Sequence, residues 1–193
     1  QGGKVKGTVS WSMTGKHNIS NALSAVAAAR HVGVSLKIAC EALSHFKGVK
    51  RRMELVYSET NPSKPNLHIY DDFAHHPTAI ETTLAGLREK IKDELILAVI
   101  EPASHTMKLG THESALAKST IHANQAIWFQ PANINWDMEN LSKGRISLTD
   151  NIEDLILEVT QIIKTRKSPL HVVIMSNGSF SSFQENLINQ ISS

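Results

Sequence analysis

The stretch Tyr70-Asp71-Asp72-Phe73-Ala74-His75-His76-Pro77 decides the fold prediction for this chain of 193 residues. The apolar run that leads into it, Leu67 to Tyr70, indicates a β-strand. Pro77 suits the first turn of a helix, where its missing N–H is not needed. Two carboxylates and two imidazoles therefore stand where a strand passes into a helix, which is where α/β sheets bind ligands.

Strand and helix patterns alternate on both sides of this stretch. Asp150 is the expected N-cap of the helix that follows it. We expect strands at 53–57, 67–70, 95–100, 125–129, 145–148 and 170–175, and helices at 78–91, 112–122, 151–164 and 183–191. The first two strands read as a hairpin, turned at 61–65. Such alternation predicts an α/β fold, with a mostly parallel sheet covered by helices on both faces.

The first 49 residues follow a different pattern. We expect a strand at 5–11, a helix at 18–31 and a second helix that Ser35 caps and that runs to Phe46. The basic run Lys50-Arg51-Arg52 then breaks the pattern and places a domain boundary near residue 49. Because the chain starts at Gln1-Gly2-Gly3 without Met, we expect it to be cut from a longer protein.

Composition excludes several classes of function. Lys and Arg total 20 against 18 Asp and Glu, and no basic patch with interleaved aromatic residues is present, so nucleic acid is not expected as a partner. No apolar run approaches the roughly 18 residues of a membrane span. Hydrophobic residues make up 41% of the chain, enough for a packed core. The single Cys40 predicts a reduced, cytoplasmic setting.

The Asp71, Asp72, His75 and His76 cluster allows three interpretations. Imidazole and carboxylate could bind a divalent metal. The same groups could bind a nucleotide, with a carboxylate on the ribose hydroxyls and an imidazole near phosphate. The third interpretation is a solvated turn in which an Asp caps the helix.

Other candidate residues also have a functional and a purely structural interpretation. Asn18 and Asn21 share one side of a helix turn and could pair with a purine edge, or one of them could cap the helix. Arg51 and Arg52 could clamp phosphate or ribose, or form an exposed basic linker. Loop residues after later strands could bind a carboxylate, a phosphate or another anion, or simply be polar: these are His105, Thr106, Lys108, Ser176 and Asn177. Thr14-Gly15-Lys16-His17 lacks the glycine and hydroxyl positions of a phosphate-binding P-loop.

Three runs taken together, in this order, resemble the Mur ligase family. They are Gly15-Lys16-His17-Asn18-Ile19-Ser20-Asn21-Ala22-Leu23, Phe46-Lys47-Gly48-Val49-Lys50-Arg51-Arg52-Met53-Glu54 and Asp71-Asp72-Phe73-Ala74-His75-His76-Pro77-Thr78. Within that family, Ser104, Thr106-Met107-Lys108 and Met175-Ser176-Asn177-Gly178 are similar to the member that adds a recycled murein tripeptide. The resemblance extends over essentially the whole chain.

The resemblance implies a division of the chain and a role for each site residue. Residues 1–49 would be the end of the central ATP-binding domain, and residues 50–193 the Rossmann-like C-terminal domain. Asn18 and Asn21 match the adenine-side asparagines, Arg52 and Asp72 match residues that reach ATP phosphate or ribose, and His75 falls near the terminal phosphate as a catalytic residue. His105, Thr106, Lys108, Ser176 and Asn177 would bind the peptide substrate.

The implied reaction is an ATP-dependent ligation in peptidoglycan recycling. It would join L-alanyl-γ-D-glutamyl-meso-diaminopimelate to UDP-N-acetylmuramate through an acyl phosphate, with Mg²⁺ on the ATP phosphates. The family's P-loop and metal ligands belong to a part of the central domain not present here, so the chain should hold no metal ligand and be inactive alone. The loop Gly178-Ser179-Phe180-Ser181-Ser182-Phe183-Gln184 also departs from the expected Gly-Gly-Phe-Gly-Gly-Ile-His.

Three alternatives remain. The first is the family's L-alanine-adding ligase, which shares the Asp-His-His-Pro region. The second is a module that binds a nucleotide or peptide and performs no chemistry. The third is a metal-dependent hydrolase built on Asp71, Asp72, His75 and His76.

Overall fold

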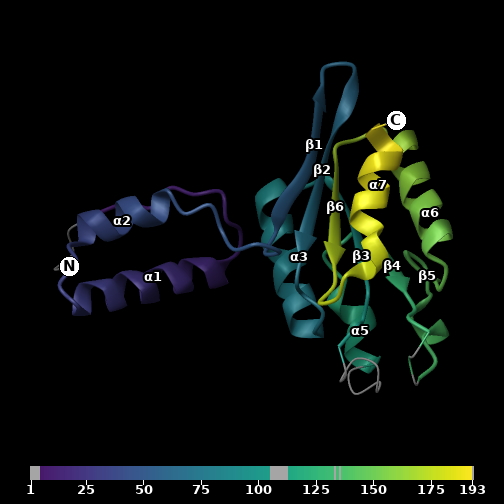
Figure 1. Cartoon of the computed structure of the whole chain (residues 1–193), viewed down its shortest axis with the longest axis horizontal. Coiled ribbons are helices and arrows are strands. Elements are labelled where there is room, and N and C mark those ends of the chain that lie inside the picture. The colour runs from purple at the N-terminus through teal and green to yellow at the C-terminus, as the bar shows by residue number, and fades with distance from the viewer. Residues whose placement is uncertain (1–4, 105–112, 133, 135, 193) are drawn as a thin grey trace. The chain divides into compact units, whose positions relative to one another are not determined.

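The computed structural model describes residues 5–104, 113–132, 134 and 136–192, and its chain divides into two compact units. They comprise Gln1–Val49 and Lys50–Ser193, and each is considered by itself (Figure 1). Among the described residues, no helix is both long enough and apolar enough to cross a membrane.

The second unit is built on a six-stranded sheet in the order β1-β2-β6-β3-β4-β5. Only β1 and β2 pair antiparallel, and every other neighbouring pair is parallel, which confirms the predicted α/β architecture. The strands are β1 (Glu54–Asn61), β2 (Lys64–Asp72), β3 (Leu95–Ile100), β4 (Gln125–Phe129), β5 (Ile146–Thr149) and β6 (Leu170–Met175). The helices are α3 (Pro77–Ile91), α5 (Glu113–Ser119), α6 (Ile152–Thr165) and α7 (Phe183–Ser192), with 3-10 turns at Glu139–Leu141 and Phe180–Ser182.

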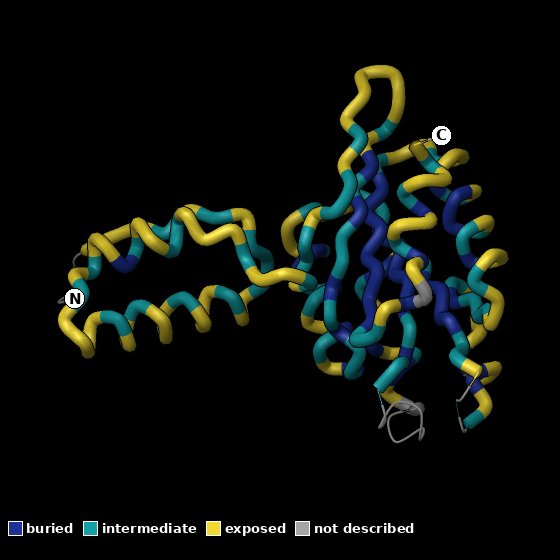
Figure 2. Tube along the Cα trace, viewed as in Figure 1, coloured by how far each residue is buried: buried dark blue, intermediate teal, exposed yellow. Residues whose placement is uncertain are grey.

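Helices cover both faces of this sheet, so its central strands are buried on both sides (Figures 1 and 2). All six residues of β6 are buried, as are all of β3 except Leu95. One core packs α3 and α5 on one face, around Leu84 and Trp128; the other packs α6 and α7 on the opposite face, around Leu155 and Phe183. Continuous apolar runs are what a doubly covered parallel sheet requires, and here they predicted β3, β4 and β6 with the bounds observed.

The carboxyl ends of β2, β6 and β3 lie at the same level. Asp72 pairs with Met175, and Met175 pairs with Ile100 on its other side. The chain leaves β2 and β3 toward the face of α3 and α5, but it leaves β6 toward the face of α7. Such a reversal between neighbouring strands is a topological switch point, where open α/β sheets form a ligand crevice.

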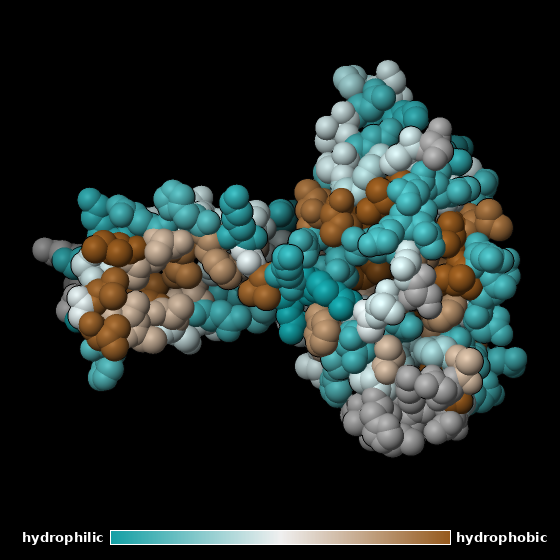
Figure 3. All heavy atoms as spheres, viewed as in Figure 1, coloured by the Kyte–Doolittle hydropathy of each residue, from teal (hydrophilic) through white to brown (hydrophobic). Residues whose placement is uncertain are grey.

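The first unit consists of α1 (Lys16–His31) and α2 (Leu36–Ser44). The Ser35 side chain accepts a hydrogen bond from Ile38 N at 3.3 Å, which confirms it as the cap of α2. No residue of α1 is buried, and apolar side chains gather on the surface of this unit (Figure 3). Those exposed are Val5, Ile19, Leu23, Val32, Ile38, Phe46 and Val49.

Two local predictions were wrong. Residues 5–11 form no strand, because a strand needs a neighbour for its N–H and C=O groups and the described part of this unit offers only helices. The N-cap of α6 is Asn151 and not Asp150. The Asn151 Oδ1 accepts hydrogen bonds from Glu153 N at 2.8 Å and Asp154 N at 3.1 Å. Sequence patterns leave helix ends uncertain by a residue or two.

Candidate functional site

Asp72 ends β2, and its carboxylate organises the turn that follows. The residue is 3% exposed. Its Oδ1 accepts from Ala74 N at 2.7 Å and its Oδ2 accepts from Met53 N at 2.8 Å. Burial raises the pKa of Asp72, while these two main-chain donors and the charge of Arg52 oppose the rise. The carboxylate thus joins the segment before β1 to the start of the Phe73–His76 turn.

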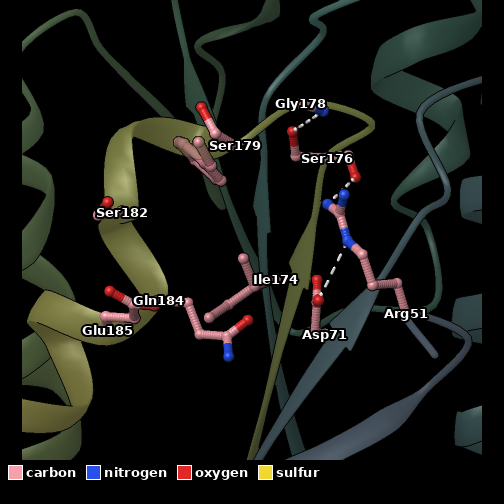
Figure 4. A pocket seen from close by; sticks show the side chains of 10 residues that line it. Arg51, Asp71, Ile174, Ser176, Gly178, Ser179, Ser182, Gln184 and Glu185 are labelled. Carbon is pink, nitrogen blue, oxygen red and sulfur yellow. Dashed lines mark hydrogen bonds and ion pairs between the residues drawn. The ribbon is translucent and has the colours of Figure 1, made fainter.

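Arg51 forms the second link at this edge (Figure 4). Its Nε lies 3.2 Å from Asp71 Oδ2, and its Nη2 donates to the main-chain oxygen of Ser176 at 2.6 Å. The Arg51 carbonyl also accepts from Phe73 N at 2.7 Å. Burial raises the pKa of Asp71, and the guanidinium of Arg51 opposes that rise.

Arg52 differs from its neighbour in being exposed. Its guanidinium carbon lies 5.4 Å from the centroid of the Phe73 ring, and its charge opposes the rise that burial causes in the pKa of Asp72. No hydrogen bond or ion pair of this guanidinium occurs within the described residues. Of the two arginines, Arg52 is therefore the one whose donors remain for a ligand. Side-chain chemistry alone could not tell the two arginines apart, and only the resemblance to the Mur ligase family pointed to Arg52.

The two histidines of the turn have separate roles. The His75 Nδ1 lies 3.0 Å from the Phe73 carbonyl, which can only accept, so Nδ1 carries the proton. Its ring stands edge-on to the Phe73 ring. His76 is the N-cap of α3, and its Nδ1 accepts from Thr78 N at 3.4 Å. His75 thus has no capping role, whereas His76 uses Nδ1 to cap α3.

Ser176 is 1% exposed and uses all of its polar groups within the chain. Its N donates to Asp72 O at 3.1 Å, and its carbonyl accepts from Arg51. Its hydroxyl donates to Glu101 Oε2 at 2.5 Å and accepts from Gly178 N at 2.9 Å. Ser176 thus holds the ends of β2, β3 and β6 together and has little capacity left for a substrate. In the described chain, the buried Oδ1 of the adjacent Asn177 finds no donor.

A cavity of about 290 Å³ opens beside these links, between the Arg51–Asp71 pair and the start of α7 (Figure 4). Its lining mixes polar and apolar surface, and Ile174 and Phe180 are its large apolar residues. The other lining residues are Arg51, Asp71, Ser176, Gly178, Ser179, Ser182, Gln184 and Glu185.

Asn18 and Asn21 lie on α1 in the first unit. The helix begins at Lys16, and its N-cap is Gly15 with φ +87°, so neither asparagine caps it. The Asn18 Nδ2 donates to Thr14 O at 2.7 Å, which leaves its Oδ1 as a free acceptor in the described chain. Asn21 is exposed.

The remaining expectations at the site have different outcomes. His105, Thr106 and Lys108 lie outside the described residues. In the part of the chain that is described, no group of three or more His, Cys, Asp or Glu side chains could hold a metal ion. The Asp71 carboxylate turns to Arg51 and that of Asp72 to main-chain donors, which removes the basis for a hydrolase built on this cluster.

Comparison with known proteins matches residues 51–178 to the family described as Mur ligase, glutamate ligase domain. Two curated relatives are named UDP-N-acetylmuramate--L-alanyl-gamma-D-glutamyl-meso-2,6-diaminoheptandioate ligase. That of Haemophilus influenzae is 37% identical over 190 residues, 98% of this chain and 41% of the relative. That of Escherichia coli is 40% identical over 188 residues, 97% of this chain and 40% of the relative. This chain thus spans about two fifths of the length of these relatives.

Solved structures agree with these matches. A murein peptide ligase from Psychrobacter arcticus superposes with a TM-score of 0.68 at 40% identity, over 96% of this chain and 39% of the other. A UDP-N-acetylmuramate-alanine ligase from Thermotoga maritima gives a TM-score of 0.69 at 20% identity, over 93% of this chain and 39% of the other, and shows the shared fold.

Proposed function

This chain belongs to the Mur ligase family, and we propose that it is part of an ATP-dependent ligase that joins L-alanyl-γ-D-glutamyl-meso-diaminopimelate to UDP-N-acetylmuramate. One observation carries the choice within the family. The two tripeptide ligases match 97–98% of the chain, whereas a UDP-N-acetylmuramate--L-alanine ligase from Desulforapulum autotrophicum, 42% identical, matches 52% of it.

The proposed reaction forms one amide bond in two steps. The lactyl carboxylate of UDP-N-acetylmuramate attacks the terminal phosphorus of ATP, which gives an acyl phosphate and releases ADP. The amine of the L-alanyl residue then attacks the acyl carbon, phosphate leaves, and the amine gives up its proton. A family member solved with ADP supports the nucleotide requirement.

Within this scheme Arg52 and His75 would contact the nucleotide phosphates. The exposed guanidinium of Arg52 offers a fork of donors suited to phosphate oxygens. His75 is proposed to lie near the terminal phosphate, with its second ring nitrogen available. Asp72 would reach the ribose only through lone pairs left over from its two main-chain hydrogen bonds, so its first role is to hold the turn that presents His75.

Asn18 and Asn21, which belong to the first unit, would contact the adenine. Asn18 retains its carboxamide oxygen as an acceptor in the described chain, and the exposed Asn21 retains both its donor and its acceptor groups there. An acceptor and a donor are what a purine edge requires.

We assign residues 1–49 to the end of a central ATP-binding domain and residues 50–193 to the C-terminal domain. Two features support this division: α1 buries none of its apolar side chains, and residues 5–11 have a strand pattern without a partner strand in the described chain.

A bound Mg²⁺ would offset the charge of the ATP phosphates. We assign its ligands to a part of the ligase outside this chain. The free Cys40 is compatible with a cytoplasmic location.

The test is a ligation assay with the full-length gene product, ATP and UDP-N-acetylmuramate. Phosphate release and a product of the expected mass are measured with the tripeptide and, separately, with L-alanine. We expect turnover with the tripeptide. Turnover with L-alanine alone would assign the protein to the L-alanine ligases, and binding of nucleotide or peptide without phosphate release would identify a non-catalytic module.

Site variants then test the nucleotide contacts. Arg52→Gln should raise the KM for ATP by about tenfold, the effect of losing one charge-assisted hydrogen bond. Lys118→Gln, on the exposed side of α5, is the matched control and should leave that KM unchanged. An unchanged KM for ATP in Arg52→Gln would remove Arg52 from the nucleotide site.

A further inference from the structure

Glu101 is a carboxylate at the switch point of the sheet. It is the first residue after β3, and its N donates to Met175 O at 2.9 Å, so it sits beside the end of β6. Its Oε2 accepts from the Ser176 hydroxyl at 2.5 Å. Its side chain is partly exposed, so a ligand could approach it.

No cation within the described residues pairs with this carboxylate. No Lys, Arg or His nitrogen of that part of the chain lies within 4.0 Å of it, and its Oε1 meets no donor there. The two other carboxylates at this edge are committed, Asp71 to Arg51 and Asp72 to main-chain N–H groups. Within the described residues, Glu101 is therefore the one acid among these three that has neither a cationic partner nor a main-chain donor.

The immediate surroundings of Glu101 also favour a donor-rich ligand. Asn177 stands between Ser176 and Gly178, which both come close to Glu101, and its buried Oδ1 meets no donor in the described chain. Gly178 lies so close that a Cβ there would come within 3.3 Å of Glu101 Oε2, so the glycine leaves room next to the carboxylate. Buried acceptors without donors are rare in native proteins and call for a ligand or a water.

We propose that Glu101 binds a protonated amine of the incoming peptide and thereby selects peptides with an ammonium group beyond the bond that is formed. The inference rests on the proposed function. The substrate named for the two relatives contains 2,6-diaminoheptandioate, a diamino diacid. One of its amines is used in the γ-glutamyl amide, and the other stays free and positively charged at neutral pH.

The physical basis is a charge-assisted hydrogen bond in a partly desolvated place. Such bonds are about twice as strong as neutral ones. The Ser176 hydroxyl fixes one carboxylate oxygen, so the second oxygen is held in place before the ligand arrives. A site prepared in this way loses less conformational freedom on binding.

The test compares two peptides by titration calorimetry on the full-length gene product. One is the tripeptide with its free distal amine, and the other is the same peptide with that amine acetylated. Glu101→Gln keeps the size of the side chain and an acceptor for Ser176 but removes the charge. In this variant the Kd for the free-amine peptide should rise about tenfold to a hundredfold. The Kd for the acetylated peptide should stay within about threefold of the wild type.

Two further variants guard against an effect on folding. Glu81→Gln neutralises an exposed carboxylate of α3 and should leave both Kd values unchanged. Glu101→Asp keeps the charge, so it should still bind the free-amine peptide more tightly than the acetylated one. This preference should persist even if the melting temperature of Glu101→Asp falls as far as that of Glu101→Gln.

The outcomes separate this inference from the proposed function. It is overturned if the wild type binds both peptides equally, or if Glu101→Gln keeps the wild-type preference for the free amine. Binding that depends on both the amine and Glu101, in a protein that releases no phosphate with the tripeptide, would leave the inference standing while the proposed function fails.

Discussion

Arg51 and Ser176 lie 125 positions apart in the chain and are joined by a hydrogen bond of 2.6 Å, from the guanidinium Nη2 to the main-chain oxygen. The same guanidinium pairs with Asp71 at the end of β2. One side chain thus ties the segment before β1 to the ends of two parallel strands. The edge of the sheet that carries the candidate site depends on this tie for its shape.

Replacing Arg51 should therefore destabilise the second unit. Arg51→Ala removes the bridge and leaves Asp71, whose side chain is 14% exposed, without its cation. We expect a loss of about 1–3 kcal/mol in the free energy of unfolding, measured by urea titration. Arg52→Ala is the matched control and should change it by less than about 0.5 kcal/mol. Equal losses in the two variants would contradict the assignment.

Asp72→Asn should be destabilising although it changes few atoms. The carboxylate accepts from Met53 N and Ala74 N with different oxygens, and asparagine has only one acceptor oxygen. One N–H would then face an amide donor, at an expected cost of about 1–3 kcal/mol. Asp93→Asn, at an exposed position, provides the control. If thermal melting shows no difference between the variants, the carboxylate does not hold the turn.

His68 should make the second unit less stable in mild acid. Burial, followed by the nearby charges of His171 and Lys90, lowers the pKa of His68 below its usual 6.5, while Glu94 opposes the shift. As the pH falls below 6.5 the unfolded chain binds this proton before the native chain does, so stability falls with pH down to the native pKa. The wild type should thus lose more stability than His68→Gln between pH 7.5 and pH 5.

The control for this pH effect is Ser58→Ala. It removes the hydroxyl that lies 3.0 Å from His68 Nδ1 but keeps the imidazole, so it should retain the wild-type pH dependence. An NMR titration of His68 measures its pKa directly. A native value at or above 6.5 would refute the explanation.

Asn151→Ala should shorten or weaken α6. Its side chain caps two N–H groups, and loss of such a cap costs about 1 kcal/mol. Asp150→Ala is the matched control, because Asp150 precedes the cap and is exposed. Urea unfolding should show this loss of stability in Asn151→Ala only. A loss in Asp150→Ala instead would identify Asp150 as the N-cap, as the sequence predicted.

Much of the second unit could be predicted from local patterns. The apolar runs of β3, β4 and β6 have the observed bounds because both faces of these strands are buried. In the first unit the prediction failed at residues 5–11, where an alternating pattern exists but no partner strand lies in the described part of that unit. A strand pattern shows only that a segment could join a sheet.

The site was less predictable than the fold. The sequence identified Asp72, Ser176 and the Arg51–Arg52 pair as candidates, but it did not predict the bridge made by Arg51 or the links made by Ser176. The structure places Arg51 in the bridge and uses every polar group of Ser176 within the chain. Glu101 had no distinguishing signal, because nothing local shows whether a carboxylate has a cationic partner.

By itself the sequence determined the order and type of the elements in the second unit and, through its ordered motifs, the family. These features follow from side-chain period, capping and turn residues, which act over a few positions. Only the tertiary structure decided that β6 lies between β2 and β3, and so which of the polar residues after these strands meet. That choice depends on contacts between segments far apart in the chain, such as Arg51 with Ser176 and Ser176 with Glu101.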